Sequence, residues 1–207
     1  IMNKATIPFD IVPLDIKNLS MYTRKVDAKQ SNEFSFTRFL VPYLSSYKGI
    51  SIYLDCDMML RTDIADLITE IGTKPIYVVK HDYKPKNKNK YLGARQYNYP
   101  RKNWSSVIVW NCSHASNLIV TPDLVNNSKP NYLHQLQFVK DEEIGELDVR
   151  WNWLVGEYSN TPEDVKNVHW TLGGPYFEKY KDVEFANEWT AMLKKVIITA
   201  PKVNYDI

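Results

Sequence analysis

Ser51-Ile-Tyr-Leu-Asp55-Cys-Asp57-Met58 joins an apolar run directly to two carboxylates that are separated by one residue. Side chains alternate between the two faces of an extended chain, so Asp55 and Asp57 are expected on one side and Cys56 on the other. Like charges on one side repel unless a cation lies between them. Carboxylate oxygens suit Mg²⁺ or Mn²⁺, and strand ends of α/β sheets are common ligand sites. The pattern predicts that this pair holds a metal ion, which in turn holds a phosphorylated ligand.

Two aspartates at this spacing are a weak signal alone, because chains of this composition contain such a pair by chance. The alternative is a turn after a strand, with Asp57 or Asp63 capping the following helix. The metal interpretation gains weight from its surroundings, since an apolar strand precedes the pair and a cap-like Thr62-Asp63 follows it. Apolar residues then recur at helical spacing: Ile64, Leu67, Ile68 and Ile71.

Apolar patterns elsewhere predict alternating strands and helices, which is typical of an α/β fold. The expected strands are residues 9–14, 75–80, 106–111 and 168–170, and the expected helical segments are residues 36–44, 118–125, 133–139 and 185–196. Pro42 predicts a kink, or a break into two short turns, inside the first of these segments. A length of 207 residues suits one well-buried domain. The opening Ile1-Met-Asn-Lys predicts that this domain is incomplete at its N-terminus.

Composition indicates an ordinary globular protein, with 44% hydrophobic residues and a net charge of +2. Cys56 and Cys112 each lie in or beside an apolar run, which predicts buried free thiols in a reducing compartment. No run approaches the ~18 apolar residues of a membrane span, and the start of the sequence has no signal-peptide pattern. We therefore expect a cytoplasmic protein without a transmembrane segment.

Further motifs follow in a fixed order: Phe36-Thr-Arg38-Phe-Leu-Val-Pro42, Tyr47-Lys-Gly, Tyr53-Leu-Asp55-Cys-Asp57, Ile64-Ala-Asp-Leu67, Ser105-Ser-Val-Ile-Val-Trp-Asn111, Trp151-Asn152 and His169-Trp-Thr-Leu-Gly173-Gly174-Pro175. In this order and spacing they resemble family 8 glycosyltransferases, which include glycogenin and the bacterial lipopolysaccharide galactosyltransferases. The resemblance covers residues 9–175. No single motif is specific, but their combination is.

The resemblance implies a GT-A-like nucleotide-diphospho-sugar transferase fold, with a mixed central sheet flanked by helices. It also implies a nucleotide-sugar donor such as a UDP-sugar, a glycan or other hydroxyl acceptor, Mn or Mg dependence, and retention of anomeric configuration. The implied metal ligands are Asp55, Asp57 and His169. The residues implied in donor binding are Arg38, Asn103, Gly173 and Gly174.

The sequence departs from the family pattern in four places. The family's asparagine in the strand before Ser105 is Trp104 here, with Asn103 one position away. The family's Lys-Pro-Trp after the late histidine is replaced by Gly174-Pro175-Tyr176, which removes a lysine that contacts the diphosphate. The acidic-Gln-acidic acceptor motif corresponds at best to Asp141-Glu142-Glu143, which makes Asp141 and Glu142 the catalytic candidates. A solvated turn is the alternative for these acids. The family's first strand and helix would lie upstream of Ile1.

Other candidates also have structural alternatives. His169 resembles an ordinary core histidine at the end of an apolar strand, and Arg38 could pair with Glu33 on a helix surface. The tryptophans at 151, 153 and 170 are expected in the core rather than against a sugar.

Residues 81–102 form a long segment rich in lysine, arginine and tyrosine, for which a solvated loop is the simplest expectation. The same composition is typical of a non-catalytic binder of nucleic acid or anionic glycan. The near-neutral net charge weighs against this, so no nucleic-acid partner is expected.

A second rival is a phosphohydrolase with Asp55 as nucleophile and Asp57 as acid/base. Such enzymes usually place Thr or Val two residues after the second aspartate, where this chain has Met59.

Overall fold

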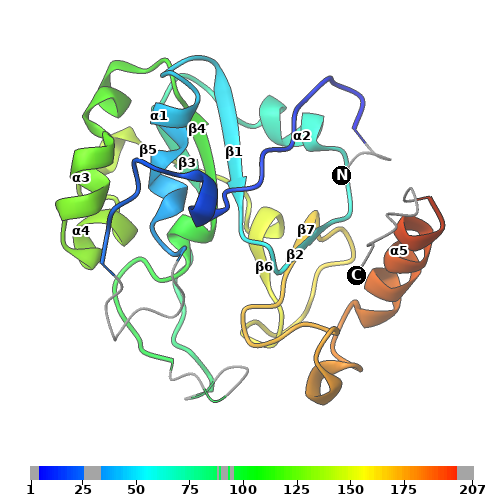
Figure 1. The fold of residues 1–207 in the computed structure, drawn as a ribbon. Helices are drawn as coiled ribbons and strands as arrows, with labels where there is room; N and C mark the ends of the chain where they lie inside the picture. The colour runs from blue at the N-terminus through cyan, green and yellow to red at the C-terminus, as the bar shows by residue number, and fades with distance from the viewer. Residues whose placement is uncertain (1–4, 26–33, 88, 90–92, 94–95, 200–207) are drawn as a thin grey trace, which may run out of the picture.

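The computed structural model describes residues 5–25, 34–87, 89, 93 and 96–199 (Figure 1). Its larger sheet has four strands in the order β1-β4-β3-β5. These are β1 (Ile50–Leu54), β3 (Ile76–Val78), β4 (Val107–Asn111) and β5 (Ile144–Glu146). β4 runs antiparallel to β1 and β3, whereas β5 runs parallel to β3, so the sheet is mixed. The register places Leu54 opposite Val107, and Ile76 opposite both Trp110 and Ile144.

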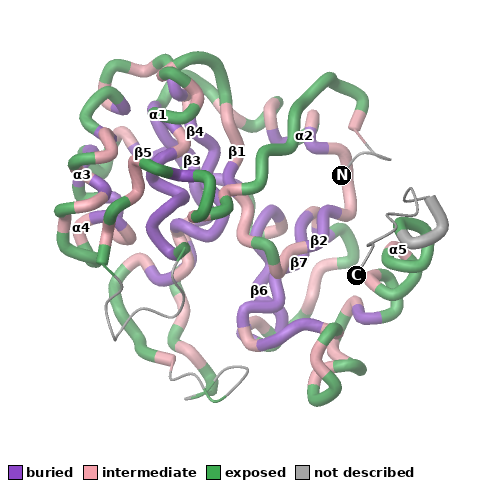
Figure 2. The backbone as a smooth tube through the Cα atoms, viewed as in Figure 1, coloured by how far each residue is buried: buried purple, intermediate pink, exposed green. Residues whose placement is uncertain are grey.

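β4 lies between β1 and β3, and its first four residues, all apolar, are buried (Figure 2). Ile108 and Trp110 belong to one core and Val107 and Val109 to the other, as the two-residue period of a strand requires. The first core is covered by α1 (Val41–Leu44), α3 (Pro122–Asn127) and α4 (Pro130–His134), and the second by α2 (Ile64–Thr69). Helices on both faces of a mixed sheet confirm the α/β fold.

A smaller sheet has three strands in the order β2-β7-β6. These are β2 (Met58–Leu60), β6 (Trp153–Leu154) and β7 (Asn167–His169), followed by the C-terminal helix α5 (Ala186–Thr199). Met59, Val168 and Trp170 form its core, against which Trp189 and Met192 of α5 pack. The three tryptophans at 151, 153 and 170 are buried, which confirms their predicted place in the core.

Short helical turns make up much of the rest. The 3₁₀ helices are Ile16–Asn18, Thr37–Leu40, Trp104–Ser106, Ala115–Ile119, Asp141–Glu143, Val149–Asn152 and Glu178–Tyr180. The first motif of the sequence resemblance therefore splits into a 3₁₀ turn and α1, with Pro42 in the first turn of α1. This is the break expected from a proline that lacks a backbone N–H.

Two expectations from the sequence are wrong. Residues 9–14 form no strand in the described structure, although they are apolar. They belong to an exposed segment that crosses the molecule from α2, where the Thr6 N–H donates to Asp63, to α3, where Arg24 donates to the Val125 carbonyl. Pro13 removes a backbone donor that a strand would need. Cys56 is exposed rather than buried, whereas Cys112 is buried as expected.

The described helices include none that combines the length and apolar character needed to span a bilayer.

Gly145 of β5 lies against the ring of Tyr77 on β3, so a β-carbon at position 145 would overlap that ring. The ring cannot easily move, because its hydroxyl accepts from the N–H groups of Gly72 at 2.6 Å and Lys74 at 2.9 Å. We expect Gly145→Ala to lower the free energy of unfolding by about 1–3 kcal/mol, as overpacking does. Urea denaturation measures this change.

The matched control is Glu146→Ala, which alters the next, exposed residue of the same strand and is expected within about 0.5 kcal/mol of wild type. Equal stability of the two variants would contradict the close packing of Tyr77 on Gly145.

Candidate metal centre

Asp55-Cys56-Asp57 carries the chain from the larger sheet into the smaller one, because β1 ends just before it and β2 begins just after it. The backbone N–H of Asp55 donates to the Ser106 carbonyl at 3.1 Å, immediately before β4. The carbonyl of Asp57 accepts from the N–H of Trp170 at 3.1 Å, immediately after β7. Each aspartate is thus fixed to a different sheet, and their separation depends on how the two sheets pack.

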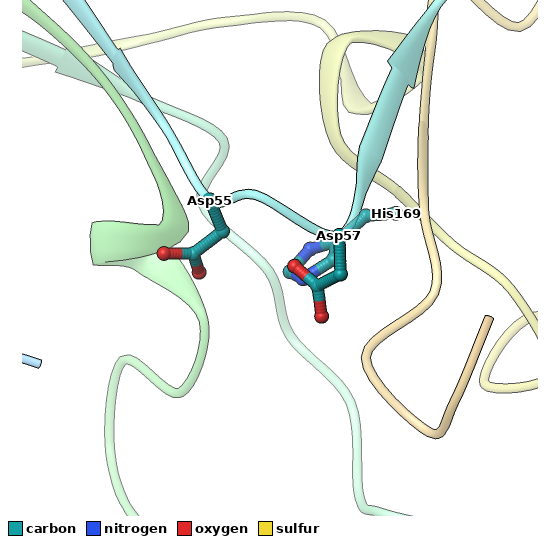
Figure 3. A group of neighbouring side chains, drawn as sticks. All are labelled: Asp55, Asp57 and His169. Carbon is teal, nitrogen blue, oxygen red and sulfur yellow. The ribbon is translucent and has the colours of Figure 1, made fainter. Parts of the chain in front are cut away.

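His169 completes a cluster with these two aspartates. It is the last residue of β7 and lies opposite Met58, the first residue of β2. Its Nε2 is 3.3 Å from Oδ1 of Asp57, and one ligand atom from each of the three residues lies within 4.8 Å of the others. Figure 3 shows both carboxylates on the same side of the connecting segment, with the imidazole beside Asp57. The structure therefore brings together the three residues predicted to bind metal.

The chemistry and spacing of this cluster fit a divalent cation. Two carboxylates and one imidazole suit Mn²⁺, and the carboxylates alone suit Mg²⁺. Ligand atoms at 2.0–2.1 Å on opposite sides of an ion are about 4.2 Å apart, so the cluster would need to tighten only slightly. The side chains of Asp55 and Asp57 are 18% and 21% exposed, whereas that of His169 is 3% exposed. The carboxylates are thus accessible to an ion and to oxygens from a further ligand.

Arg38 holds Asp55 in place. Its Nη2 forms an ion pair with Oδ1 of Asp55 at 2.8 Å, and its Nη1 and Nε donate to the carbonyls of Ser105 and Ser35. Burial disfavours the guanidinium charge, but the Asp55 carboxylate, with further contributions from Tyr53 and Tyr99, raises the pKa of Arg38. Arg38 is therefore buried beneath the cluster and orients an aspartate. Glu33, its alternative partner, lies outside the described residues.

Asn103 lies at the same end of the larger sheet as Asp55, directly before the 3₁₀ helix Trp104–Ser106. Its backbone is left-handed, with φ of 62°, and its Nδ2 donates to the hydroxyl of Tyr83 at 2.7 Å. Its donor-binding role stays a prediction.

Gly173 and Gly174 follow His169 closely in the chain, and both are buried. A β-carbon at position 173 would lie 2.5 Å from the Tyr180 ring, and one at 174 would overlap the Tyr176 ring. Gly173 also has φ of 139°, which side chains rarely tolerate. Close approach of two tyrosines thus accounts for both glycines, and their contact with a diphosphate stays a prediction.

The structure does not bring Asp141 and Glu142 to the cluster. Both are exposed and precede β5, whose first residue lies beside Ile76 at the start of β3. Asp55 follows the opposite end of the sheet, three strands away. Asp141 instead forms an ion pair with Arg101 at 2.6 Å. Their catalytic role stays a prediction, and we leave them out of the site proposed below.

Sequence reasoning missed three residues around the cluster. Tyr53 donates to Oδ1 of Asp55 at 2.8 Å, and strand alternation could have found it because residues 53 and 55 share a face. Asn152 accepts from Nδ1 of His169 at 2.9 Å. His134 pairs through Nδ1 with Ser105 Oγ at 2.9 Å. No local sequence pattern indicates the last two contacts.

The segment 81–102 lies beside this end of the sheet and is largely exposed where it is described. Tyr83 anchors it to Asn103, and the buried Glu157 accepts from the Lys86 N–H and the Gln96 side chain. Some of the basic and aromatic residues noted in the sequence lie outside the described residues: Lys88, Lys90, Tyr91 and Arg95.

Comparison with known proteins gives one close relative. No protein-family model matches the chain. It is 42% identical over 197 residues to Protein CDI of Arabidopsis thaliana, which covers 91% of this chain and 76% of that protein. The chain belongs to the Protein CDI family.

Two solved structures resemble the CDI-family fold. The glycosyltransferase GlyE of Streptococcus pneumoniae TIGR4 aligns with a TM-score of 0.53 at 13% identity, covering 79% of this chain and 46% of GlyE. The bifunctional glycosyltransferase WbbM aligns with a TM-score of 0.51 at 14% identity, covering 75% of this chain and 34% of WbbM. The chain thus spans about half the length of GlyE and about a third of the length of WbbM. The likeness confirms a GT-A-like fold and does not distinguish family 8 from other glycosyltransferase families.

His81, which follows β3, predicts how stability depends on pH. Burial, together with the nearby His169, lowers its pKa to about 3. In the unfolded chain its pKa is about 6.5, so the unfolded state binds more protons between pH 6.5 and 3. The free energy of unfolding should therefore fall as the pH drops through this window, by up to about 1.4 kcal/mol per pH unit from this residue. Urea denaturation at a series of pH values measures the slope.

His81→Phe should flatten this slope. At about pH 8, where imidazole is neutral in both states, the same variant reports its packing effect separately. Parallel curves for wild type and variant over the acid range would contradict a buried, neutral His81.

Proposed function

We propose that this chain is a metal-dependent glycosyltransferase that moves a sugar from a UDP-sugar to a glycan or other hydroxyl acceptor. The observation that carries the proposal is the cluster of Asp55, Asp57 and His169 at the carboxyl end of β1, within a glycosyltransferase fold. Ligands of α/β folds bind at such strand ends. We further propose that residues 1–207 belong to one glycosyltransferase domain, and that the reaction retains anomeric configuration, as the sequence resemblance implies.

In this proposal Asp55, Asp57 and His169 hold Mn²⁺ or Mg²⁺. When bound, the ion supplies positive charge that offsets the charge of the departing diphosphate. Arg38 holds the Asp55 carboxylate in position through an ion pair, and Tyr53 through a hydrogen bond.

The two alternative functions, a phosphohydrolase and a polyanion binder, make different demands on these residues. A phosphohydrolase would use Asp55 as a nucleophile, but the Asp55 carboxylate already accepts from Arg38 and Tyr53, and the fold resembles glycosyltransferases. A polyanion binder would rely on the segment 81–102 and would need neither aspartate. We therefore favour sugar transfer.

Titration calorimetry of UDP into the full chain tests this proposal. Wild type is expected to bind UDP with Mn²⁺ present and not with EDTA. Changes outside the ligand sphere already cost 10–100-fold in metal affinity, so Asp57→Ala should weaken Mn²⁺-dependent UDP binding by at least about 100-fold. Asp66→Ala is the matched control, because it removes an exposed aspartate of α2 with the same change in charge. It should bind UDP as wild type does.

UDP binding that survives both EDTA and Asp57→Ala would contradict the metal site. Phosphatase turnover abolished by Asp55→Asn would favour the phosphohydrolase instead. Salt-sensitive polyanion binding that survives both substitutions would favour the binding module.

A further inference from the structure

We propose that Asn152 is a positioning residue that fixes His169 in the tautomer whose Nε2 lone pair faces Asp57. The inference rests on the metal site proposed above and adds to it a residue outside the cluster. Asn152 belongs to the 3₁₀ helix Val149–Asn152, and its side chain is fully buried. It touches the imidazole nitrogen on the far side from Asp57.

The backbone carbonyl of Asn103 can only accept hydrogen bonds. Ser106 Oγ lies 2.7 Å from it, so the Ser106 hydroxyl hydrogen must point at this carbonyl. The Ser106 oxygen is then an acceptor for its other neighbour, the Asn152 side chain at 2.8 Å. Asn152 must therefore present Nδ2 to Ser106.

With Nδ2 facing Ser106, the Asn152 carbonyl oxygen faces His169. This oxygen lies 2.9 Å from Nδ1 of the imidazole and can only accept. Nδ1 must therefore carry a hydrogen. In a neutral imidazole the other nitrogen, Nε2, then has a free lone pair. His169 thus donates to Asn152, Asn152 donates to Ser106, and Ser106 donates to the carbonyl of Asn103.

The flipped orientation of the Asn152 side-chain amide is disfavoured by contacts around the Asn103 carbonyl. If the Asn152 amide were flipped, its oxygen would face Ser106 Oγ at 2.8 Å and the Asn103 carbonyl at 3.4 Å. Ser106 would have to turn its hydrogen to Asn152, leaving two oxygens 2.7 Å apart at Asn103. Ser106, Asn152 and His169 are at most 3% exposed, so bulk water cannot relieve such clashes. Buried polar groups left without a partner are costly.

This tautomer suits the cluster to a cation. It sets the Nε2 lone pair against Oδ1 of Asp57 at 3.3 Å, and two acceptors at that distance repel unless a cation or a proton lies between them. A metal-ligating histidine that donates its other N–H to a nearby acceptor is oriented and made a better ligand. Asn152 would therefore prepare His169 for metal before any ion arrives.

Nitrogen-detected NMR of the metal-free full chain tests the tautomer directly. Only four histidines need assignment, and His169→Gln identifies one of them. At about pH 8.5, where imidazoles are neutral, wild-type His169 is expected to carry its hydrogen on Nδ1. Asn152→Leu removes the acceptor and should abolish this preference.

Calorimetric titration of Mn²⁺ is the second measurement. Asn152→Leu is expected to weaken Mn²⁺ binding about 10–100-fold. Asn167→Leu is the matched control. It removes an equally buried asparagine of β7 that bonds the Trp151 carbonyl rather than the imidazole, so it should lower stability without changing Mn²⁺ affinity.

A hydrogen on Nε2 in wild type would overturn the inference, and this measurement needs no variant to fold. Wild-type Mn²⁺ affinity in a folded Asn152→Leu would overturn it as well. If wild type binds no Mn²⁺ yet His169 carries its hydrogen on Nδ1 only while Asn152 is present, the proposed metal function fails and the positioning role stands.

Discussion

The passage of the chain between two sheets is the constraint on which the site depends. One backbone hydrogen bond fixes Asp55 to Ser106, just before β4 of the larger sheet. Another fixes Asp57 to Trp170, just after β7 of the smaller sheet. Neither sheet alone carries two aspartates and the histidine, because His169 comes from β7 and Asp55 follows β1. The cluster therefore exists only while the sheets keep their mutual packing, which the apolar contacts of Leu60 of β2 with the core of Val107 and Val109 of β4 support.

The two carboxylates do not share one environment, although they are two residues apart. Asp55 has Arg38 and Tyr53 as buried partners, so part of its charge is compensated within the protein. Asp57 faces an imidazole whose other nitrogen is taken by Asn152. Removing Arg38 would leave Asp55 with an uncompensated charge in a partly buried place, which is costly. One aspartate is thus held rigidly by a protein cation, and the other meets His169 across the space that a metal would occupy.

Local rules were enough to predict several elements around the cluster. The apolar run of β4, the cap at Asp63 and the break at Pro42 follow from side-chain period, capping chemistry and the missing proline N–H. Residues 9–14 satisfied the same apolar pattern and form no strand, because a strand also needs a neighbour to accept its hydrogen bonds. The place of Asp141 in the fold could not be predicted for a similar reason. Its position depends on the register of β5 beside β3, which no local pattern reveals.

The orientation of the side chains in the site could be predicted even less well from the sequence. Trp151-Asn152 and His169 could be noted as motifs, but which imidazole nitrogen is protonated depends on a chain of hydrogen bonds that ends at Asn103. The direction of that carbonyl follows from a left-handed backbone, with φ of 62°, a conformation that asparagine tolerates better than most residues. In the proposed series of hydrogen bonds, a backbone carbonyl outside the cluster thereby determines that a lone pair, rather than an N–H, faces Asp57.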